Sequence, residues 1–348
     1  MVKPPTKILI IRTDRLGDVI LSTPVIKNLK LAFPQAHISF MCRPYTKEAL
    51  LGNPWLDEVI VYDKYGKHKS FFATIKFSFF LRKKQFDWAV ILHPTNRVHL
   101  LAFLAGIPLR AGWDRKLGFL LNKKLFHTKD KGEKHELDYT LDVLRSLDVP
   151  IQEKNTYFPF DKKANKRVEE LLKNKGLAED DKFIAIHPSA SCISKRWPID
   201  HFMELIRLLK EKTNFKIIVI SSEAEKSFVK RLTEELDVID LCGSLGISEL
   251  GSLLKRATLF ISNDSGPVHI AASLNTPVIS IFGRKDPGLS PTRWKPVGKQ
   301  AYYIHKDAGC RICLAHNCQR GFQCLGNISP QDLLEIVMNI FKGNNDSR

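Results

Sequence analysis

Short apolar runs rich in β-branched residues alternate along the chain with longer segments in which apolar residues recur at every third or fourth position. Runs of the first kind predict buried strands, and segments of the second kind predict amphipathic helices. In the first half, strands are predicted at 7–12, 37–42, 58–62 and 88–92, and a helix is predicted around Val19, Ile20, Val25, Ile26 and Leu29. This alternation of strand and helix predicts a parallel α/β sheet.

A second series of the same kind follows a polar helical stretch at 164–175. It predicts strands at 183–187, 216–221, 259–263 and 278–282 and helices at 202–212, 223–236, 248–255, 268–274 and 330–341. We therefore place a domain boundary near 155–165 and divide the chain into 1–160 and 161–348. The predicted fold class is α/β, with two Rossmann-like domains. Because parallel sheets bind ligands beyond the carboxyl ends of their strands, we expect the two domains to face each other across a cleft.

Length and composition exclude several classes of protein. A chain of 348 residues with 44% hydrophobic and 26% charged residues is long enough for two folded domains and is neither disordered nor of low complexity. Its longest nearly uncharged apolar stretch, 98–109, is shorter than the roughly 18 residues that a membrane-spanning helix needs. The N-terminal residues lack the apolar core and cleavage site of a secretory signal, so we expect a cytoplasmic protein.

The charge of the chain is strongly positive, with 54 basic and 37 acidic residues and a net charge of +17. The excess is concentrated in residues 1–150, which hold 25 basic and 14 acidic residues. Such an asymmetry indicates an anionic partner. A nucleic acid, a phosphorylated substrate and an anionic lipid surface all fit, so a basic nucleic-acid-binding protein is one interpretation of the charge alone.

Fingerprints of several enzyme classes are absent from the sequence. No G-x-G-x-x-G follows the first predicted strand, and no G-x-x-x-x-G-K-[ST] occurs. These absences disfavour dinucleotide-dependent dehydrogenases and P-loop enzymes. The chain also lacks H-E-x-x-H, G-x-S-x-G and a calcium-loop pattern, which disfavours the common hydrolases.

The loop after the first strand carries a candidate general base, Asp18, next to the flexible Gly17 at the start of a helix. A helix dipole keeps such a carboxylate ionised but lowers its basicity, unless burial or a nearby acid such as Asp14 raises its pKa. The alternative is an acid in the first turn that only stabilises the helix, by about 0.3–1 kcal/mol.

A second candidate site follows the predicted strand at 259–263 and comprises residues 264–269. Free backbone amides at Ser265 and Gly266, at a helix N-terminus, suit a diphosphate. Asp264 would repel phosphate and suits a sugar or ribose hydroxyl better. The alternative is a purely structural helix start, with Pro267 at the first helical position.

The loop 188–198 combines small hydroxyl residues with two cations ahead of a helix. Ser189 and Ser191 can cradle phosphate, and Lys195 can neutralise the charge that develops on a departing diphosphate. Lys195 and Arg196 are equally interpretable as solvated loop charges.

Three blocks of the chain together resemble the lipopolysaccharide heptosyltransferases of glycosyltransferase family 9. They are Arg12–Asp18 with Thr23-Pro24, Lys195–Pro198, and Asn263–Ala272 followed by Pro277-Val278 and Phe282-Gly283. The resemblance implies a GT-B fold with an acceptor-binding N-terminal domain and a donor-binding C-terminal domain. It further implies transfer of heptose from ADP-heptose with inversion, without a cofactor or an essential metal. A related nucleotide sugar is an alternative donor.

The resemblance assigns expected roles to individual residues. Asp18 is expected to be the catalytic base, and Lys195 is expected to stabilise the leaving diphosphate. The expected donor-binding residues are Ser189, Ser191, Lys195, Glu225, Asp264, Ser265, Gly266 and His269. Ser265 departs from the family, which commonly has Thr there, but keeps the hydroxyl. Glu225 is the better-spaced candidate for the ribose or adenine contact, although it also fits a simple first-turn acid.

The acceptor implied by the resemblance is an anionic lipopolysaccharide precursor at the cytoplasmic leaflet of the inner membrane. Residues 64–84 hold seven basic and no acidic residues interleaved with five phenylalanines, which predicts peripheral contact with that leaflet. Some of the phenylalanines are alternatively part of the core. Expected acceptor-binding residues are Arg15, Gly17, Lys64, Lys67, His93 and Arg97, of which His93 and Arg97 also fit capping or solvated roles. We expect a monomer that does not bind nucleic acid.

Four of the seven cysteines fall in one short segment, Cys310-x2-Cys313-x4-Cys318-x5-Cys324, which also contains His316. The spacing differs from that of two separated C-x2-C knuckles. A structural zinc site, and with it a zinc-dependent interaction module, is one interpretation, and free thiols are the other.

Overall fold

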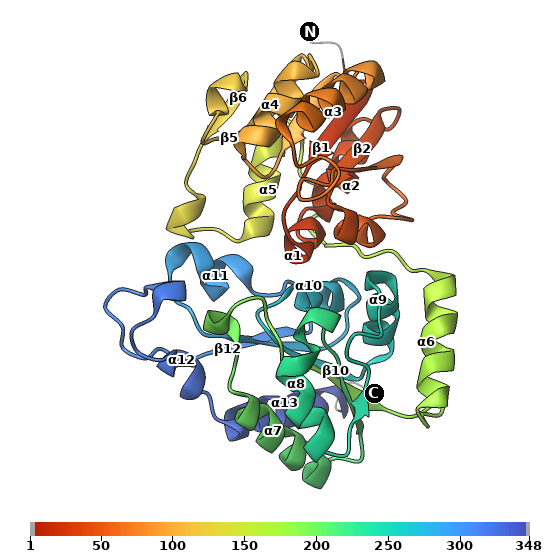
Figure 1. The fold of residues 1–348 in the computed structure, drawn as a ribbon, viewed down its shortest axis with the longest axis vertical. Coiled ribbons are helices and arrows are strands. Elements are labelled where there is room, and N and C mark those ends of the chain that lie inside the picture. The colour runs from red at the N-terminus through yellow and green to blue at the C-terminus, as the bar shows by residue number, and fades with distance from the viewer. Residues whose placement is uncertain (1–3, 346–348) are drawn as a thin grey trace. The chain divides into compact units, whose positions relative to one another are not determined.

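The computed structural model describes residues 4–345 and contains two compact units, Met1–Phe160 and Asp161–Arg348. Each unit is built on one six-stranded sheet in which every neighbouring pair of strands is parallel. Helices connect the strands and flank both sheets (Figure 1). The predicted α/β class with two Rossmann-like domains is confirmed.

The sheet of the first unit has the strand order β3-β2-β1-β4-β5-β6. Its strands are β1 (Lys7–Ile11), β2 (His37–Cys42), β3 (Glu58–Val61), β4 (Trp88–Ile91), β5 (Leu109–Asp114) and β6 (Lys123–Phe126). Its helices are α1 (Leu16–Ile20), α2 (Thr23–Ala32), α3 (Phe71–Lys84), α4 (Asn96–Leu104) and α5 (Glu136–Arg145). Alternate residues of the central strand β1 point to opposite faces of the sheet. Leu9 and Ile11 belong to the core that also holds the inner sides of α3 and α4.

The sheet of the second unit repeats this topology in the order β12-β11-β10-β7-β8-β9. Its strands are β7 (Phe183–His187), β8 (Lys216–Val219), β9 (Ile239–Asp240), β10 (Leu259–Asn263), β11 (Val278–Phe282) and β12 (Ala301–His305). Its helices are α6 (Lys162–Asn174), α7 (Ile199–Lys212), α8 (Lys226–Glu235), α9 (Ile247–Arg256), α10 (Gly266–Ser273), α11 (Pro291–Trp294), α12 (Gln323–Gly326) and α13 (Pro330–Asn345). Strand β7 lies at the centre and is fully buried along its length, as a strand covered on both faces must be.

The predicted helix after the first strand is in fact two helices, α1 and α2, with a break at Leu21 and Ser22. Pro24 has no N–H to donate to the carbonyl of Ile20. The hydroxyl of Thr23 donates to that carbonyl instead, at 2.7 Å. The break ends the short helix that carries Asp18 and fixes its length at five residues.

The hydrophobic pattern missed the edge strands β6, β9 and β12 and the interior strand β5. Strands β6 and β12 lie at the ends of their sheets and are partly or largely exposed, so they lack a continuous apolar run. Strand β5 was missed because Arg110 and Gly112 interrupt its apolar residues. Within residues 4–345, no helix combines the length and the apolar character that crossing a bilayer requires.

Candidate functional site

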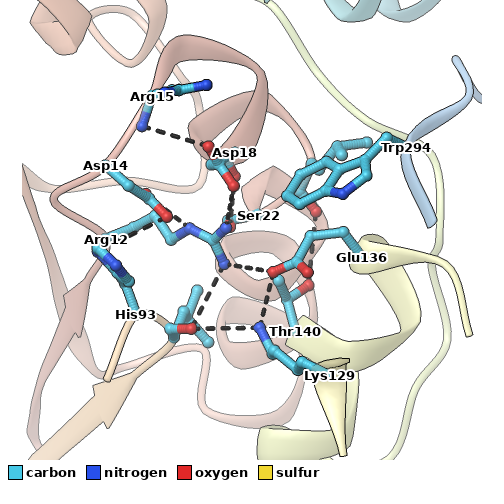
Figure 2. Close-up of polar contacts among 12 residues, drawn as sticks. Arg12, Asp14, Arg15, Asp18, Ser22, His93, Lys129, Glu136, Thr140 and Trp294 are labelled. Carbon is cyan, nitrogen blue, oxygen red and sulfur yellow. Dashed lines mark hydrogen bonds and ion pairs between the residues drawn. The ribbon is translucent and has the colours of Figure 1, made fainter. Parts of the chain in front are cut away.

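The first unit carries a buried charge cluster beyond the carboxyl ends of β1 and β4 (Figure 2). Arg12 directly follows β1 and is only 2% exposed. Its Nε donates to Asp14 Oδ1 at 2.8 Å and its Nη1 to Glu136 Oε1 at 2.9 Å, while its Nη2 donates to Asp18 Oδ1. One guanidinium is therefore shared by three carboxylates. Such charge-assisted hydrogen bonds fix the position of every partner.

Lys129 is the second cation of this cluster and is almost completely buried. Its Nζ lies 2.7 Å from Glu136 Oε1, and its ammonium lies over the rings of Trp113 and Tyr139. Three carboxylates and two cations leave the cluster with one excess negative charge. The sequence analysis missed Lys129 and Glu136, because neither follows a strand that the hydrophobic pattern predicts.

The pKa of Asp18 is raised to about 6, by burial first and by the neighbouring Asp14 second. Glu136 raises it further, and Arg12 opposes the shift. Burial and Asp14 are the two influences that we expected to offset the helix dipole. Asp18 is thus ionised at neutral pH and is basic enough to accept a proton, as a general base must be.

The remaining expected acceptor residues occupy different surroundings. His93 Nδ1 lies 3.6 Å from Asp14 Oδ2, but burial and then Arg12 lower its pKa to about 3, so the ring is neutral at pH 7 and this approach is not an ion pair. Arg97 donates to the backbone carbonyls of Lys64 and Lys69 at 3.0 and 2.9 Å. It therefore holds the 64–69 loop in place.

Arg15 and Gly17 lie at the start of α1, and Lys64, which is half-buried, and Lys67 lie in the 64–69 loop. Arg15 is the exposed N-cap residue of α1, and Gly17 is buried within that helix. Lys67 is exposed on the loop. Gly17 can therefore shape the turn before Asp18, whereas the side chains of Arg15 and Lys67 are free to meet a ligand.

The outer face of α3 combines phenylalanines with cations. Phe77 is buried in the core, whereas Phe71, Phe72, Phe79 and Phe80 are 61%, 82%, 53% and 45% exposed. Phe72, Lys76, Phe79 and Lys83 follow one another at the helical spacing of three or four residues, and all four are exposed. We call this stripe the α3 aromatic face. It answers the question that the sequence left open, because only one of the five phenylalanines belongs to the core.

The second unit carries a smaller buried charge cluster beyond the ends of β10 and β11. Asp264 is 5% exposed, and its Oδ2 lies 2.8 Å from both Lys195 Nζ and Arg284 Nη2. Burial raises the pKa of Asp264, but Lys195 and Arg284 outweigh it and hold the pKa below its ordinary value. Two cations against one carboxylate leave one excess positive charge, which suits an anionic ligand.

The predicted anion-binding turn opens α10, and its helix begins one residue earlier than expected. Gly266 is the first helical residue and Pro267 the second, which corrects the placement of Pro267 at the first position. Ser265 is the N-cap residue, and its side chain does not cap the helix. His269 is buried in the first turns of this helix and lowers the pKa of Asp264.

A polar network around His187 joins the other expected donor residues. His187 Nε2 lies 3.0 Å from Ser189 Oγ, and the Ser189 hydroxyl donates to Glu225 Oε2 at 3.1 Å. On its other side, His187 Nδ1 lies 3.1 Å from Ser262 Oγ, which lies 2.9 Å from Ser265 Oγ. Burial lowers the pKa of His187 to about 4, with Glu225 opposing the shift, so the ring is neutral at pH 7.

Sequence reasoning missed two residues of the second unit, His187 and Arg284. Each lies at or just beyond the carboxyl end of a strand that was predicted, which is the signal that could have found them. Ser191 is the one expected donor residue whose side chain is exposed on its loop, away from this network.

The four clustered cysteines are free thiols of intermediate burial. Residues 4–345 contain no group of three or more His, Cys, Asp or Glu side chains arranged to hold a metal ion. His316, inside the cysteine segment, instead lies 2.9 Å from the hydroxyl of Ser194 through its Nδ1. The segment thereby contacts the loop that carries Lys195.

Solved structures define the fold family of this chain. One is a family 9 glycosyltransferase from Veillonella parvula, with a TM-score of 0.86 and 23% identity over 96% of each chain. Another is the ADP-heptose lipopolysaccharide heptosyltransferase II of Escherichia coli, with a TM-score of 0.80 and 23% identity over 97% of this chain and 99% of that one. The two units thus have the GT-B fold of these enzymes.

Sequence comparison gives the family. The family model of glycosyltransferase family 9 (heptosyltransferase) matches residues 75–322, and the chain belongs to this family. Lipopolysaccharide heptosyltransferase 2 of Escherichia coli K12 is 26% identical over 344 residues, or 94% of this chain and 97% of the relative. Lipopolysaccharide heptosyltransferase 3 of the same strain is 26% identical over 331 residues, or 91% and 93%.

Proposed function

We propose that the protein transfers heptose from ADP-heptose to the inner core of lipopolysaccharide, onto Kdo-lipid A or onto a heptose already attached to it, with inversion at the anomeric carbon. The observation that carries the proposal is Asp18, a buried carboxylate whose pKa of about 6 suits a general base. Membership of the family and the names of the relatives support the donor and the acceptor.

In this mechanism, Asp18 accepts the proton of the acceptor hydroxyl as that oxygen attacks the anomeric carbon. The glycosidic bond to ADP breaks in the same displacement, so the configuration inverts. Asp264 does not compete for the role of base, because Lys195 and Arg284 hold it in its ionised, paired form.

The donor binds to the second unit in this proposal. Lys195, together with the backbone amides at Ser265 and Gly266, stabilises the negative charge of the departing ADP. Glu225 accepts from the ribose hydroxyls, with Ser189 holding its carboxylate in place. The excess positive charge around Asp264 favours the diphosphate over a neutral ligand.

A transfer assay tests this function. Purified protein is incubated with ADP-heptose and a heptose-free inner-core lipid, and products are followed by mass spectrometry and by NMR of the new anomeric centre. We expect one added heptose per ADP released, with the configuration opposite to that of the donor. A thermal-shift screen of nucleotide sugars identifies the donor, because a ligand of the folded state raises Tm. A larger rise in Tm with another nucleotide sugar would identify that compound as the donor in place of ADP-heptose.

We also propose peripheral contact with the cytoplasmic leaflet of the inner membrane, made by the α3 aromatic face. Exposed phenylalanines flanked by cations suit an anionic bilayer surface.

We expect the protein to sediment with vesicles of anionic phospholipid and not with neutral ones. The double variant Phe72→Ser, Phe79→Ser should release it. The control Phe126→Ser removes a phenylalanine that is 81% exposed on β6 and should have no effect. Salt-sensitive binding to nucleic acid, without binding to vesicles, would favour a nucleic acid as the anionic partner in place of the membrane.

A further inference from the structure

Arg12 holds Asp18 with only part of its donor capacity. A guanidinium has five N–H groups and often grips a carboxylate with two of them. Here Nε is committed to Asp14 and Nη1 to Glu136 and the carbonyl of Leu92, which leaves Nη2 alone for Asp18. Only Oδ1 of Asp18 is therefore bound by Arg12. Its Oδ2 faces the backbone N–H of Arg15 at a longer 3.3 Å (Figure 2).

We infer that Glu136 and Lys129 are positioning residues that hold the far side of the Arg12 guanidinium, so that Arg12 engages Oδ1 of Asp18 and leaves Oδ2 as the atom that takes the proton. The inference rests on the proposed function, in which Asp18 is the base. It adds to that function an explanation of how Asp18 is oriented and of what sets its strength as a base.

The burial and contacts of the two residues support this role. The side chain of Glu136 is 1% exposed, and its Oε1 accepts from Arg12 and Lys129 at 2.9 and 2.7 Å. Lys129 cannot swing away, because its ammonium also donates to the carbonyl of Leu92 and lies over the ring of Trp113. Without the Oε1 acceptor of Glu136, Arg12 would be free to turn and grip both oxygens of Asp18. A two-pronged ion pair favours the charged carboxylate and weakens it as a base.

The titratable groups around Asp18 come from several elements of the first unit. They are Arg12 after β1, Asp14 and Arg15 in the following loop, Tyr45 in the 3-10 helix Pro44–Ala49, His93 after β4, Lys129 in the 3-10 helix Lys129–Lys131, and Glu136 at the start of α5. Among them, Glu136 and Lys129 carry opposite charges and contact each other. Removing either charge, with the Oε1 acceptor at position 136 kept, therefore shifts the balance of charge at Asp18 in a predictable direction, and removing both charges restores it.

A pH profile of kcat tests the inference. Glu136→Gln keeps the side-chain shape and the acceptor Oε1 but removes a negative charge, so the acidic limb should move to lower pH, by about one unit. Lys129→Met removes the neutralising cation and should move the limb to higher pH. The double variant should return it close to the wild-type position. Lower activity with an unmoved limb in both single variants would mean a merely structural role and would overturn the inference.

A second readout does not depend on transfer activity. The free energy of unfolding is measured against pH for each protein with and without Asp18→Asn, and the difference between the two curves has its midpoint halfway between the folded and the unfolded pKa of Asp18. We expect this midpoint near pH 5 in the wild type, because the folded pKa is about 6 and the unfolded pKa about 4, and at lower pH with Glu136→Gln. If Glu136→Gln does not fold, the Lys129→Met variant tests the inference, and its midpoint is expected at higher pH than that of the wild type. If the midpoint moves but no heptose is transferred, only the proposed function is wrong. If heptose is transferred but the midpoint does not move, only the positioning role is wrong.

Discussion

The two units each place a buried ion cluster beyond the carboxyl edge of the same sheet topology, but with opposite net charge. In the first unit, Asp14, Asp18 and Glu136 outnumber Arg12 and Lys129. In the second unit, Lys195 and Arg284 outnumber Asp264. Both clusters lie beyond the carboxyl ends of parallel strands, where loops converge.

This difference in sign sets the chemistry that each cluster can perform. The excess of carboxylates, together with burial, raises the pKa of Asp18 to about 6 and makes it a usable base. The excess of cations lowers the pKa of Asp264 and leaves a positive field for an anion. One scaffold thus supports proton acceptance in one unit and anion binding in the other, and the fold alone does not decide which.

The strongest contrast is expected from Asp18→Asn and Lys195→Met. Both should lower kcat by about a thousandfold, since one removes the base and the other a charge that stabilises the leaving group. Asp18→Asn should retain wild-type affinity for ADP, whereas Lys195→Met should lose about tenfold. Isothermal titration with ADP separates the two. Loss of ADP binding in Asp18→Asn would contradict the division of roles between the units.

Acid pH should affect the contributions of Asp18 and His187 to stability in opposite directions. The folded pKa of Asp18 lies above its unfolded value, so Asp18 binds a proton first in the folded protein and gains stability as pH falls from about 6 to 4. The folded pKa of His187 lies below its unfolded value, so the unfolded chain protonates first and stability is lost as pH falls from about 6.5 to 4.

Each of these two effects amounts to about 3 kcal/mol over its full range. Urea unfolding at pH 7.5 and 4.5 measures them. Relative to the wild type, Asp18→Asn should become less stable on acidification, and His187→Asn should become more stable. A change in stability of the same sign in both variants would contradict the expected difference between Asp18 and His187.

Arg284 is expected to contribute stability as well as charge. Arg284→Met leaves the buried Asp264 with Lys195 as its remaining cation, and we expect a loss of about 3 kcal/mol in the free energy of unfolding. The neighbouring Lys285→Met removes an exposed ion pair with Asp307 and should change stability by less than about 1 kcal/mol. Equal effects in the two variants would show that the cluster at Asp264 is not an energetic unit.

The smallest effect is expected at Ser265. Ser265→Thr keeps the hydroxyl that meets Ser262, and the extended backbone at this residue accepts a β-branched side chain. We expect kcat/KM within about twofold of the wild type, whereas Ser265→Ala should lose about 1 kcal/mol of stability with its hydrogen bond. A large loss in Ser265→Thr would mean that the turn tolerates no extra methyl group near the ligand.

Most strands in the middle of each sheet were predictable because burial on both faces favours an uninterrupted apolar run, and the interior strand β5 was missed because Arg110 and Gly112 interrupt its run. Four of them, at 37–42, 183–187, 259–263 and 278–282, have the predicted bounds. Edge strands such as β6 and β12 were not predictable, because one open side permits lysine and tyrosine among their residues.

The two charge clusters show the same difference between what a local sequence pattern predicts and what only the folded chain decides. The sequence by itself determined the α/β class, the series of loops after the strands and the candidates Asp18, Lys195 and Asp264, because hydrophobic spacing and local motifs are properties of neighbouring residues. Only the tertiary structure decided that Glu136, which is 124 residues from Arg12, shares its guanidinium, and that Arg284 pairs with Asp264. The net charge and the pKa of a buried group depend on every ion that folding gathers around it, and no local pattern in the chain encodes that sum.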